Sequence, residues 1–370
     1  MRIAIATAGR FHVLDLAREL ERLGHDVRFY SYVPRARARG FGLKDECQVS
    51  LLPYALPMLI WERLAPDLWP RARERCLRAA LNCAVILRLQ PGDVFICMSG
   101  VYLEAARHAK TSFGARIWLE RGSRHILSQD EILAAIPGAQ RPSADTISRE
   151  LCGYDLADRI VIPSSHVGES FQRAPAAYAK LFRNPYGVDL SMFPATAHQR
   201  NGAVFTALCV GSWCLRKGCD VLAAAIRQNP GVRLVHVGEL GDLAFPSDAD
   251  QFIHYDPVPQ NHLKQHYAQA DIFVLASLEE GLSVVQAQAL ASGLPLICTD
   301  RTGGADLAHT PSLAERIMVV PHGDIDALAM AIANLRCRLE AGGMPPITEA
   351  DRQTLSWAAY AARYNDELIS

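Results

Sequence analysis

Short apolar runs alternate with amphipathic stretches along this chain, and the alternation strongly limits the folds it can adopt. The apolar run at 3–7 precedes a helical pattern over 13–23, and a second apolar run follows at 27–30. Buried-strand runs that alternate with helical patterns are typical of βαβ units, in which the strands lie parallel. The sequence therefore predicts an α/β protein built on parallel sheets.

Residues 271–293 contain the most informative of these units. The run Ile272–Leu275 predicts a buried strand, and a helical pattern resumes a few residues later. Glu279, Glu280 and Gly281 would thus lie between the carboxyl end of a strand and a helix N-terminus. Open α/β sheets bind ligands at that edge, and helix N-termini attract phosphate groups. We expect a ligand site here; the alternative is an ordinary loop with two solvated carboxylates.

A second loop of this kind follows the predicted strand at 204–210. It ends in Arg216, Lys217 and Gly218, directly before a predicted helix at 219–227. Two cations at one helix N-terminus suit a diphosphate, although a solvated pair of basic residues would have the same sequence. Polar residues also follow the predicted strand at 116–119, which makes that strand end another candidate site.

Composition limits the possible classes of protein. The chain has 370 residues, enough for two domains, and its formal net charge is −1, which does not indicate nucleic-acid binding. Residues 1–190 carry a charge of +6 and residues 191–370 a charge of −7. This asymmetry predicts an N-terminal surface that meets an anionic partner, unless the imbalance arose by chance.

Cysteine usage and hydropathy predict a cytoplasmic protein. The ten cysteines include no CxxC pair, and several lie in apolar runs. The first apolar run is too short for a signal peptide, and no uncharged apolar stretch reaches about 20 residues. His262 and His266 have helical spacing but no evident third ligand, so we expect no metal site.

Residues 33–78 differ from the rest of the chain. Apolar residues, aromatics and four prolines lie between two arginine-rich stretches, and Arg35, Arg37 and Arg39 suggest a turn. Arginines beside aromatics predict weak binding to an anionic membrane through Arg35–Arg39, Trp61, Trp69 and Arg71–Arg78. The alternative is a lid or packing segment over the first domain.

Taken together, segments 184–189, 211–218 and 271–304 resemble the retaining glycosyltransferases of family 4, which have the GT-B fold. The resemblance extends weakly to 1–30 and 150–171. It implies two Rossmann-like domains that face each other across a cleft. The expected divisions are an acceptor-binding domain at 1–195, a donor-binding domain at 196–350, and a helix at 351–370 that crosses back; the linker is expected at about 190–202.

The resemblance also implies roles for the two loops. Glu280 matches the glutamate that contacts the donor sugar, and Lys217 matches a cation on the diphosphate. Gln288 replaces the glutamate that holds the ribose, and Ser212 replaces an arginine, for which Arg216 is a substitute. The residues implied at the donor site are Gly9, Arg10, Gly211, Ser212, Arg216, Lys217, Val258, Gly281, Leu282, Ser283, Val284 and Gln288.

In the first domain, the family has a histidine followed by glycine that faces the donor sugar. Arg121 occupies that position here, and His125 lies one turn later. We therefore expect Glu280, Arg121 and His125 as catalytic residues. The implied substrate contacts are Glu120, Ser123, Gly303 and Gly304, the last two in a flexible loop.

The implied reaction moves a hexose from a nucleotide diphosphate sugar to an acceptor hydroxyl with retention, in bacterial polysaccharide or glycoconjugate synthesis. No cofactor and no metal are implied, because cations and helix N-termini neutralise the diphosphate. A saccharide or lipid-linked acceptor is expected, and the enzyme could lie on the inner face of the membrane. The alternatives are an epimerase or phosphorylase of the same fold, or a binding protein that has lost catalysis, for which Gln288 and Ser212 are the evidence.

Overall fold

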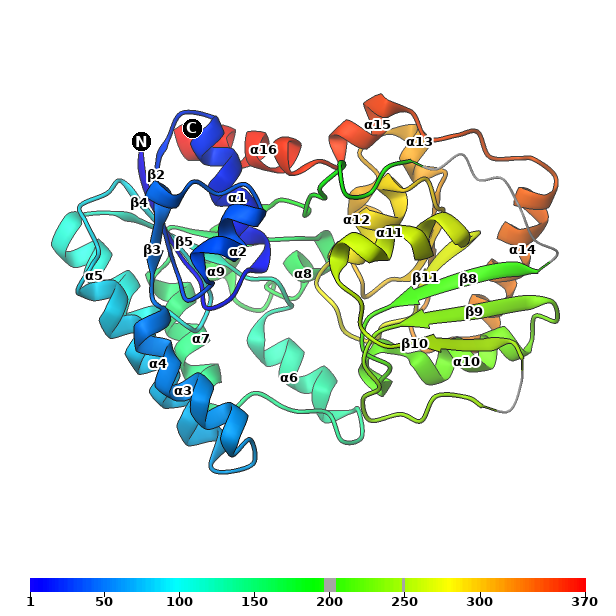
Figure 1. Cartoon of the computed structure of the whole chain (residues 1–370), viewed down its shortest axis with the longest axis horizontal. Coiled ribbons are helices and arrows are strands. Elements are labelled where there is room, and N and C mark those ends of the chain that lie inside the picture. The colour runs from blue at the N-terminus through cyan, green and yellow to red at the C-terminus, as the bar shows by residue number, and fades with distance from the viewer. Residues whose placement is uncertain (196–203, 248–249) are drawn as a thin grey trace.

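The computed structural model describes residues 1–195, 204–247 and 250–370, and the strands among them form two separate parallel sheets (Figure 1). The first sheet has the order β3-β2-β1-β4-β5-β6-β7 and the second β10-β9-β8-β11-β12-β13. The strands are β1 Arg2–Ala6, β2 Asp26–Ser31, β3 Gln48–Ser50, β4 Val94–Met98, β5 Arg116–Glu120, β6 Arg159–Ile162, β7 Leu181–Arg183, β8 Phe205–Val210, β9 Val232–Val237, β10 Phe252–Tyr255, β11 Ile272–Leu275, β12 Leu296–Thr299 and β13 Ile317–Val320.

Helices connect most of the successive strands and cover both sheets. Those of the first half are α1 Phe11–Arg22, α2 Arg35–Gly40, α3 Leu52–Leu64, α4 Pro70–Ile86, α5 Leu103–Phe113, α6 Ile126–Ala134, α7 Ala144–Leu156, α8 Ser165–Glu169 and α9 Pro175–Tyr178. The rest are α10 Cys219–Arg227, α11 Gln260–Gln269, α12 Val284–Ala291, α13 Pro311–Ala314, α14 Ile325–Glu340, α15 Glu349–Thr354 and α16 Trp357–Ile369. The predicted α/β class, with two Rossmann-like parallel sheets, is confirmed.

Strand order explains where sites can form. In each sheet the chain reverses its direction of travel between the two central strands, β1 and β4 in the first sheet and β8 and β11 in the second. The loops that leave such a pair diverge to opposite faces of the sheet and leave a crevice at the carboxyl edge. The loops after β8 and β11 are the two that carry Arg216, Lys217, Glu279 and Glu280.

The segment 33–78 is mostly helical, so the turn predicted at Arg35, Arg37 and Arg39 is wrong. Arg35, Arg37 and Arg39 lie in α2, and most of the remaining segment forms the antiparallel pair α3 and α4. Pro53 and Pro70 occupy first turns of helices, where the missing N–H has no helical partner to lose. Pro57 lies inside α3. Two of the prolines in this segment thus lie at the starts of helices and do not end them.

The last helix returns to the first half of the chain, where it packs against α1 (Figure 1). The Tyr364 hydroxyl donates to Glu120 Oε1 at 2.9 Å, and Arg159 pairs with Glu367 at 2.8 Å. The expected linker lies partly outside the described residues, at 196–202. The domain boundary at residue 195 therefore stays a prediction.

The two halves of the chain meet where the backbone of Gly281 packs directly against the backbone of Gly122. A Cβ on Gly281 would lie 1.8 Å from the Gly122 carbonyl oxygen, so a side chain has no space there. The Ser164 hydroxyl lies 2.7 Å from the Gly281 carbonyl oxygen, and His166 Nε2 lies 2.8 Å from the Glu280 carbonyl oxygen. This contact joins the loop after β11 to the end of β5 and to the start of α8.

Gly281→Ala tests this contact. The added methyl group must move one backbone away from the other, so we expect a loss of about 1–3 kcal/mol in the free energy of unfolding, the usual cost of overpacking. Calorimetric unfolding measures it. Gly40→Ala is the control, because a Cβ there meets nothing within 4 Å. Equal melting temperatures for Gly281→Ala and the wild type would contradict the contact.

Candidate functional site

A cavity of about 570 Å³ lies between the two halves, at the carboxyl edges of both sheets. Its walls carry four carboxylates, two arginines and one histidine, together with apolar and aromatic side chains. Its lining residues are Arg10, Phe11, His12, Asp15, Met98, Ser99, Glu120, Arg121, Gly122, Ser123, Tyr186, Val188, Asp189, Gln260, Glu280, Leu282, Val284, Gln288 and Trp357. We call this space the cleft cavity.

Two cations meet two carboxylates where the second half borders the cleft cavity. Lys217 Nζ pairs with Glu280, and Arg216 pairs with Glu279 at 3.4 Å. The Glu279 side chain is 1% exposed and that of Glu280 is 18% exposed. Because β8 and β11 are neighbours at the reversal point, their loops bring these residues together. Arg216 and Lys217 also lie just before α10, whose N-terminal N–H groups favour anions.

Gln288 lines the same cavity from α12. It lies one turn after Val284, so both side chains project from one face of the helix. The Tyr267 hydroxyl donates a hydrogen bond to Gln288 Oε1 at 3.1 Å, and Tyr267 is buried. That bond orients the amide, and an amide has two N–H donors besides its oxygen.

His12 is a cavity residue that sequence reasoning missed. Its Nε2 lies 2.8 Å from Glu120 Oε2, and its ring lies 4.3 Å from that of Tyr186, centroid to centroid. Glu120 also accepts the hydrogen bond from Tyr364 in α16. The position of His12, soon after the first strand and beside Gly9 and Arg10, could have suggested it. Tyr186 lies in segment 184–189, which the family resemblance had already marked.

Arg10 reaches across the cavity to the second half. Its Nη1 donates to Gln260 Oε1 at 2.6 Å, and its guanidinium lies 3.6 Å from Asp15 and over the Phe41 ring. Burial raises the pKa of Asp15, while Arg18 and Arg10 oppose that shift. Gln260, at the start of α11, is a second contact that the sequence did not reveal.

Arg121 lies at the cleft cavity, whereas His125 does not. The Arg121 guanidinium donates to Glu150 at 2.9 Å and to Gln129 at 2.8 Å. His125 caps α6 from a buried position, with its ring against those of Tyr154 and Phe171. Burial, with a smaller contribution from Arg121, lowers the pKa of His125. The structure thus places His125 in an aromatic core.

Some of the other predicted residues line the cleft cavity, and the rest do not. Leu282, Val284, Glu120 and Ser123 line the cleft cavity. Gly303 and Gly304 are buried, and a Cβ on Gly303 would lie 2.4 Å from the Gly281 carbonyl oxygen, so this segment packs tightly where a flexible loop was expected. The predicted residues that do not line the cavity are Gly9, His125, Gly211, Ser212, Arg216, Lys217, Val258, Gly281, Ser283, Gly303 and Gly304.

A second cavity, of about 780 Å³, lies in the first half among α4, α6 and α7. Arg71 and Glu74 line it from α4, and Gln129, Ala139 and Thr146 line other walls. Arg121 lines both cavities, so this residue lies between them. We call this space the side cavity.

The described residues also limit other kinds of site. Within the ranges 1–195, 204–247 and 250–370, no group of three or more His, Cys, Asp or Glu side chains is arranged to hold a metal ion. In those same ranges, no helix has both the length and the apolar character needed to cross a bilayer.

Sequence comparison relates part of the chain to known glycosyltransferases. Residues 204–337 match the family described as Glycosyl transferases group 1. A D-inositol 3-phosphate glycosyltransferase of Corynebacterium glutamicum is 36% identical over 123 residues, which are 31% of this chain and 28% of that protein. A sulfoquinovosyl transferase of Arabidopsis thaliana is 26% identical over 230 residues, 58% of this chain and 42% of that one. The matches therefore span less than half of either relative.

Structural comparison covers the whole chain. The sucrose-phosphate synthase of Thermosynechococcus elongatus aligns with a TM-score of 0.72 at 18% identity, over 100% of this chain and 98% of that one. HepE of Anabaena, solved with UDP-glucose, aligns with a TM-score of 0.68 at 14% identity, over 100% and 99%. The chain has the GT-B fold, and its residues 204–337 match the Glycosyl transferases group 1 family.

Proposed function

We propose that this protein is a retaining glycosyltransferase of the family 4 type, which moves a hexose from a nucleotide diphosphate sugar to an acceptor hydroxyl. One observation carries the proposal: Glu280 and Gln288 line one cavity, and Lys217 pairs with Glu280 at its edge. All three lie within the stretch that matches the Glycosyl transferases group 1 family. The structural relative HepE was solved with UDP-glucose, which supports a donor of this chemical class.

Each donor group has a partner in this arrangement. Lys217, Arg216 and the start of α10 take the diphosphate, because two cations and free N–H groups converge there. Gln288 meets the ribose through its amide, and Glu280 meets the hexose. The bond from the anomeric carbon to the diphosphate breaks, and the acceptor oxygen bonds to that carbon. The nucleoside diphosphate leaves with the bonding electrons, and the acceptor proton is released. The cations supply the charge stabilisation, and no metal is required.

We assign the acceptor to the first half of the chain. Arg121 borders both cavities, so an acceptor held in the side cavity can present a hydroxyl to the cleft cavity past this residue. The side cavity has arginine and carboxylate side chains together with apolar walls, which suits a saccharide or the head of a lipid-linked saccharide. Bacterial polysaccharide or glycoconjugate synthesis would supply such an acceptor.

Donor binding is the first test. A panel of nucleotide diphosphate sugars is screened by thermal shift, and a donor at 100 times its dissociation constant should stabilise the protein by about 2.7 kcal/mol. The donor that binds is then incubated alone and with candidate saccharides, and the products are identified by NMR. We expect slow donor hydrolysis alone, a glycoside of retained configuration with the right acceptor, and activity that survives a chelator.

Other outcomes would favour the other candidate functions. Conversion of the sugar nucleotide without any acceptor would indicate an epimerase. Tight nucleotide binding with no hydrolysis and no transfer would indicate a binding protein. Inverted configuration in the product, or activity lost with the chelator, would contradict the proposed mechanism.

Substitutions at the loop after β11 and the loop after β8 separate the roles of Glu280 and Lys217. Glu280→Gln keeps the side-chain size and removes the charge, so turnover should fall about 10²-fold, the scale of one preorganised polar contact. Lys217→Ala removes the cation on the diphosphate and should raise the donor dissociation constant as well. Steady-state kinetics and calorimetric titration of the nucleoside diphosphate measure the two effects.

Gln288→Glu is the matched contrast on α12. A carboxylate at the ribose forms a charged hydrogen bond, which should strengthen donor affinity by about 1 kcal/mol while turnover changes little. If Gln288→Glu abolished donor binding and Glu280→Gln changed nothing, both residue assignments would be wrong.

Filling the side cavity tests the acceptor assignment. Ala139→Trp places a large ring on the cavity wall and should raise the KM for the acceptor about tenfold or more, while the dissociation constant of the nucleoside diphosphate stays the same. Ala134→Trp is the control, because Ala134 is exposed at the end of α6 and does not line the side cavity. An unchanged acceptor KM in Ala139→Trp would place the acceptor elsewhere.

A further inference from the structure

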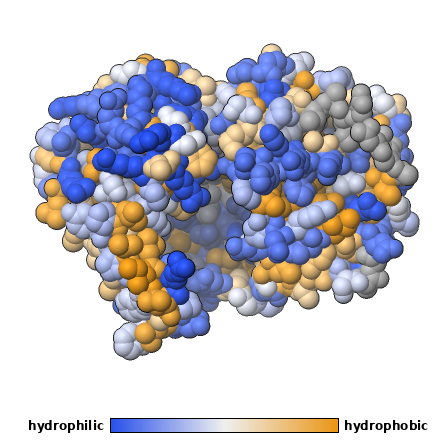
Figure 2. Space-filling view, in the orientation of Figure 1, coloured by the Kyte–Doolittle hydropathy of each residue, from blue (hydrophilic) through white to orange (hydrophobic). Residues whose placement is uncertain are grey.

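The antiparallel pair α3 and α4 carries an apolar face that the described part of the chain leaves uncovered. The pair extends away from the first sheet, and a hydrophobic strip runs along it (Figures 1 and 2). Leu56, Ile60 and Leu64 recur every four residues on α3, so they share one face. All three are exposed, Leu64 by 78%. The strip continues into Leu68 and Trp69 at the tip.

Packing among the described residues does not use this apolar face. The opposite side of α3 already buries Ala55 and packs Tyr54 and Leu59 against the core. A helix that is apolar on both sides is normally buried on both sides. Large exposed apolar patches mark surfaces that meet a protein or a membrane. The face of Leu56, Ile60, Leu64, Leu68 and Trp69, which we call the hairpin face, therefore needs a partner.

Charge near the hairpin face identifies the partner's chemistry. The segment 52–86 has five arginines and three carboxylates. Glu62 pairs with Arg73 and Glu74 with Arg78. The exposed arginines Arg63, Arg71 and Arg75 thus outnumber Asp67 around the tip. Apolar side chains with an exposed tryptophan, bordered by surplus arginines, match the boundary of an anionic bilayer.

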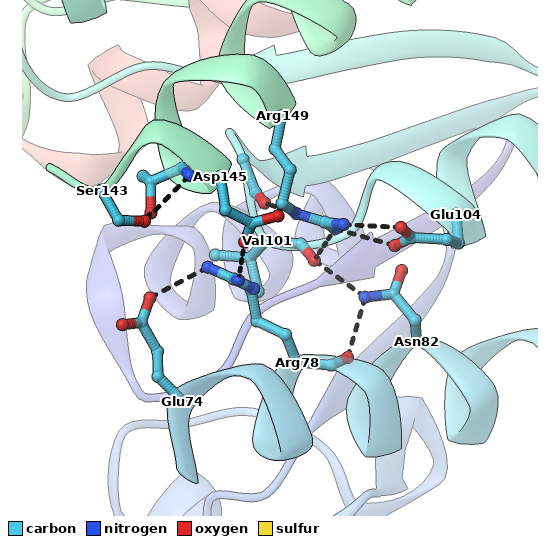
Figure 3. Close-up of polar contacts among 10 residues, drawn as sticks. Glu74, Arg78, Asn82, Val101, Glu104, Ser143, Asp145 and Arg149 are labelled. Carbon is cyan, nitrogen blue, oxygen red and sulfur yellow. Dashed lines mark hydrogen bonds and ion pairs between the residues drawn. The ribbon is translucent and has the colours of Figure 1, made fainter. Parts of the chain in front are cut away.

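The base of the hairpin is fixed, so the hairpin face is presented in one orientation. Arg78 donates to Glu74 and Asp145, which ties α4 to α7 (Figure 3). Asn82 donates to the Val101 carbonyl oxygen at 2.8 Å (Figure 3). Its amide oxygen accepts from the Ala105 N–H, which ties α4 to α5. A rigid base lets the tip enter a surface without a conformational change.

We propose that the hairpin face docks this protein onto an anionic lipid bilayer. This assignment changes the residues expected from the sequence. Trp61 turns inward with its indole Nε1 buried, and Arg73 and Arg78 are held in ion pairs. Arg35, Arg37 and Arg39 lie on α2, away from the hairpin (Figure 1). The surface consists of the hairpin face with Arg63, Arg71 and Arg75. The proposal does not depend on the catalytic assignment.

Docking would also orient the side cavity. Arg71 and Glu74 belong both to α4 and to the wall of that cavity. A bilayer at the hairpin face therefore lies next to the cavity, and a molecule with its tail in that bilayer could place its polar head there. This consequence depends on the proposed function, whereas the docking itself does not.

Vesicle co-sedimentation of the full chain tests the proposal. The probes are phosphatidylcholine vesicles with and without phosphatidylglycerol, at low and high salt. We expect binding to the anionic vesicles at low salt, weaker binding at high salt, and about tenfold weaker binding of Leu64→Asp. Met330→Asp is the matched control, because Met330 is also a largely exposed apolar residue and lies on α14. Arg63→Gln with Arg75→Gln should reduce binding to anionic vesicles as well.

Further measurements separate the loss of vesicle binding from misfolding of the variant, and none of them requires enzyme activity. Trp69 emission should shift to the blue on anionic vesicles, and the shift should be absent in Trp69→Phe. Circular dichroism checks that Leu64→Asp folds. Equal vesicle binding by Leu64→Asp and wild type, or no effect of phosphatidylglycerol or salt, would overturn the proposal. A change of molar mass in Leu64→Asp without loss of vesicle binding would also overturn it, because the hairpin face would then bind a second copy of the chain.

Discussion

The backbone contact between Gly122 and Gly281 determines how the two halves of this chain can meet. The loop after β11 approaches the end of β5 so closely that a Cβ on Gly281 would lie 1.8 Å from the Gly122 carbonyl oxygen. Ser164 and His166 hold the same loop by its carbonyl oxygens. The contact uses backbone atoms, so the Glu280 side chain is left to face the cleft cavity. The position of Glu280 thus depends on glycines and on the first half of the chain.

The charged side chains around the candidate site form ion pairs that join different segments of the chain. Lys217 with Glu280 and Arg216 with Glu279 join the two loops of the second sheet, and Arg121 with Glu150 joins β5 to α7. Buried charges are costly unless they are paired and hydrogen-bonded, so these pairs keep the site folded in the form described here. A diphosphate brought to Lys217 and Arg216 would compete with the two carboxylates for the same cations. The proposed donor binding would therefore exchange the partners of cations that are already in place.

Much of the fold could be predicted, because parallel-sheet strands appear as apolar runs between helical patterns. Glu120 and Glu280 were predicted as site residues because they lie at or just after the carboxyl ends of strands, and both line the cleft cavity. The spacing of residues along the sequence does not show which polar residues from distant loops come together at the cleft cavity, so His12 and Gln260 were missed. Nor could it separate His125, which turns into an aromatic core, from Arg121, which borders the cavity. The helices α3 and α4 were missed because their prolines resemble breaks, although two of them occupy first turns.

A crystal structure of the protein with a bound nucleotide diphosphate sugar is the most direct test of the central claim, that the cleft cavity is the donor site. We expect the diphosphate at Lys217 and Arg216, the ribose within hydrogen-bond distance of Gln288, and the hexose against Glu280. A nucleotide bound outside the cleft cavity, or bound in it with the diphosphate away from Lys217 and the ribose away from Gln288, would show that the donor site is assigned wrongly.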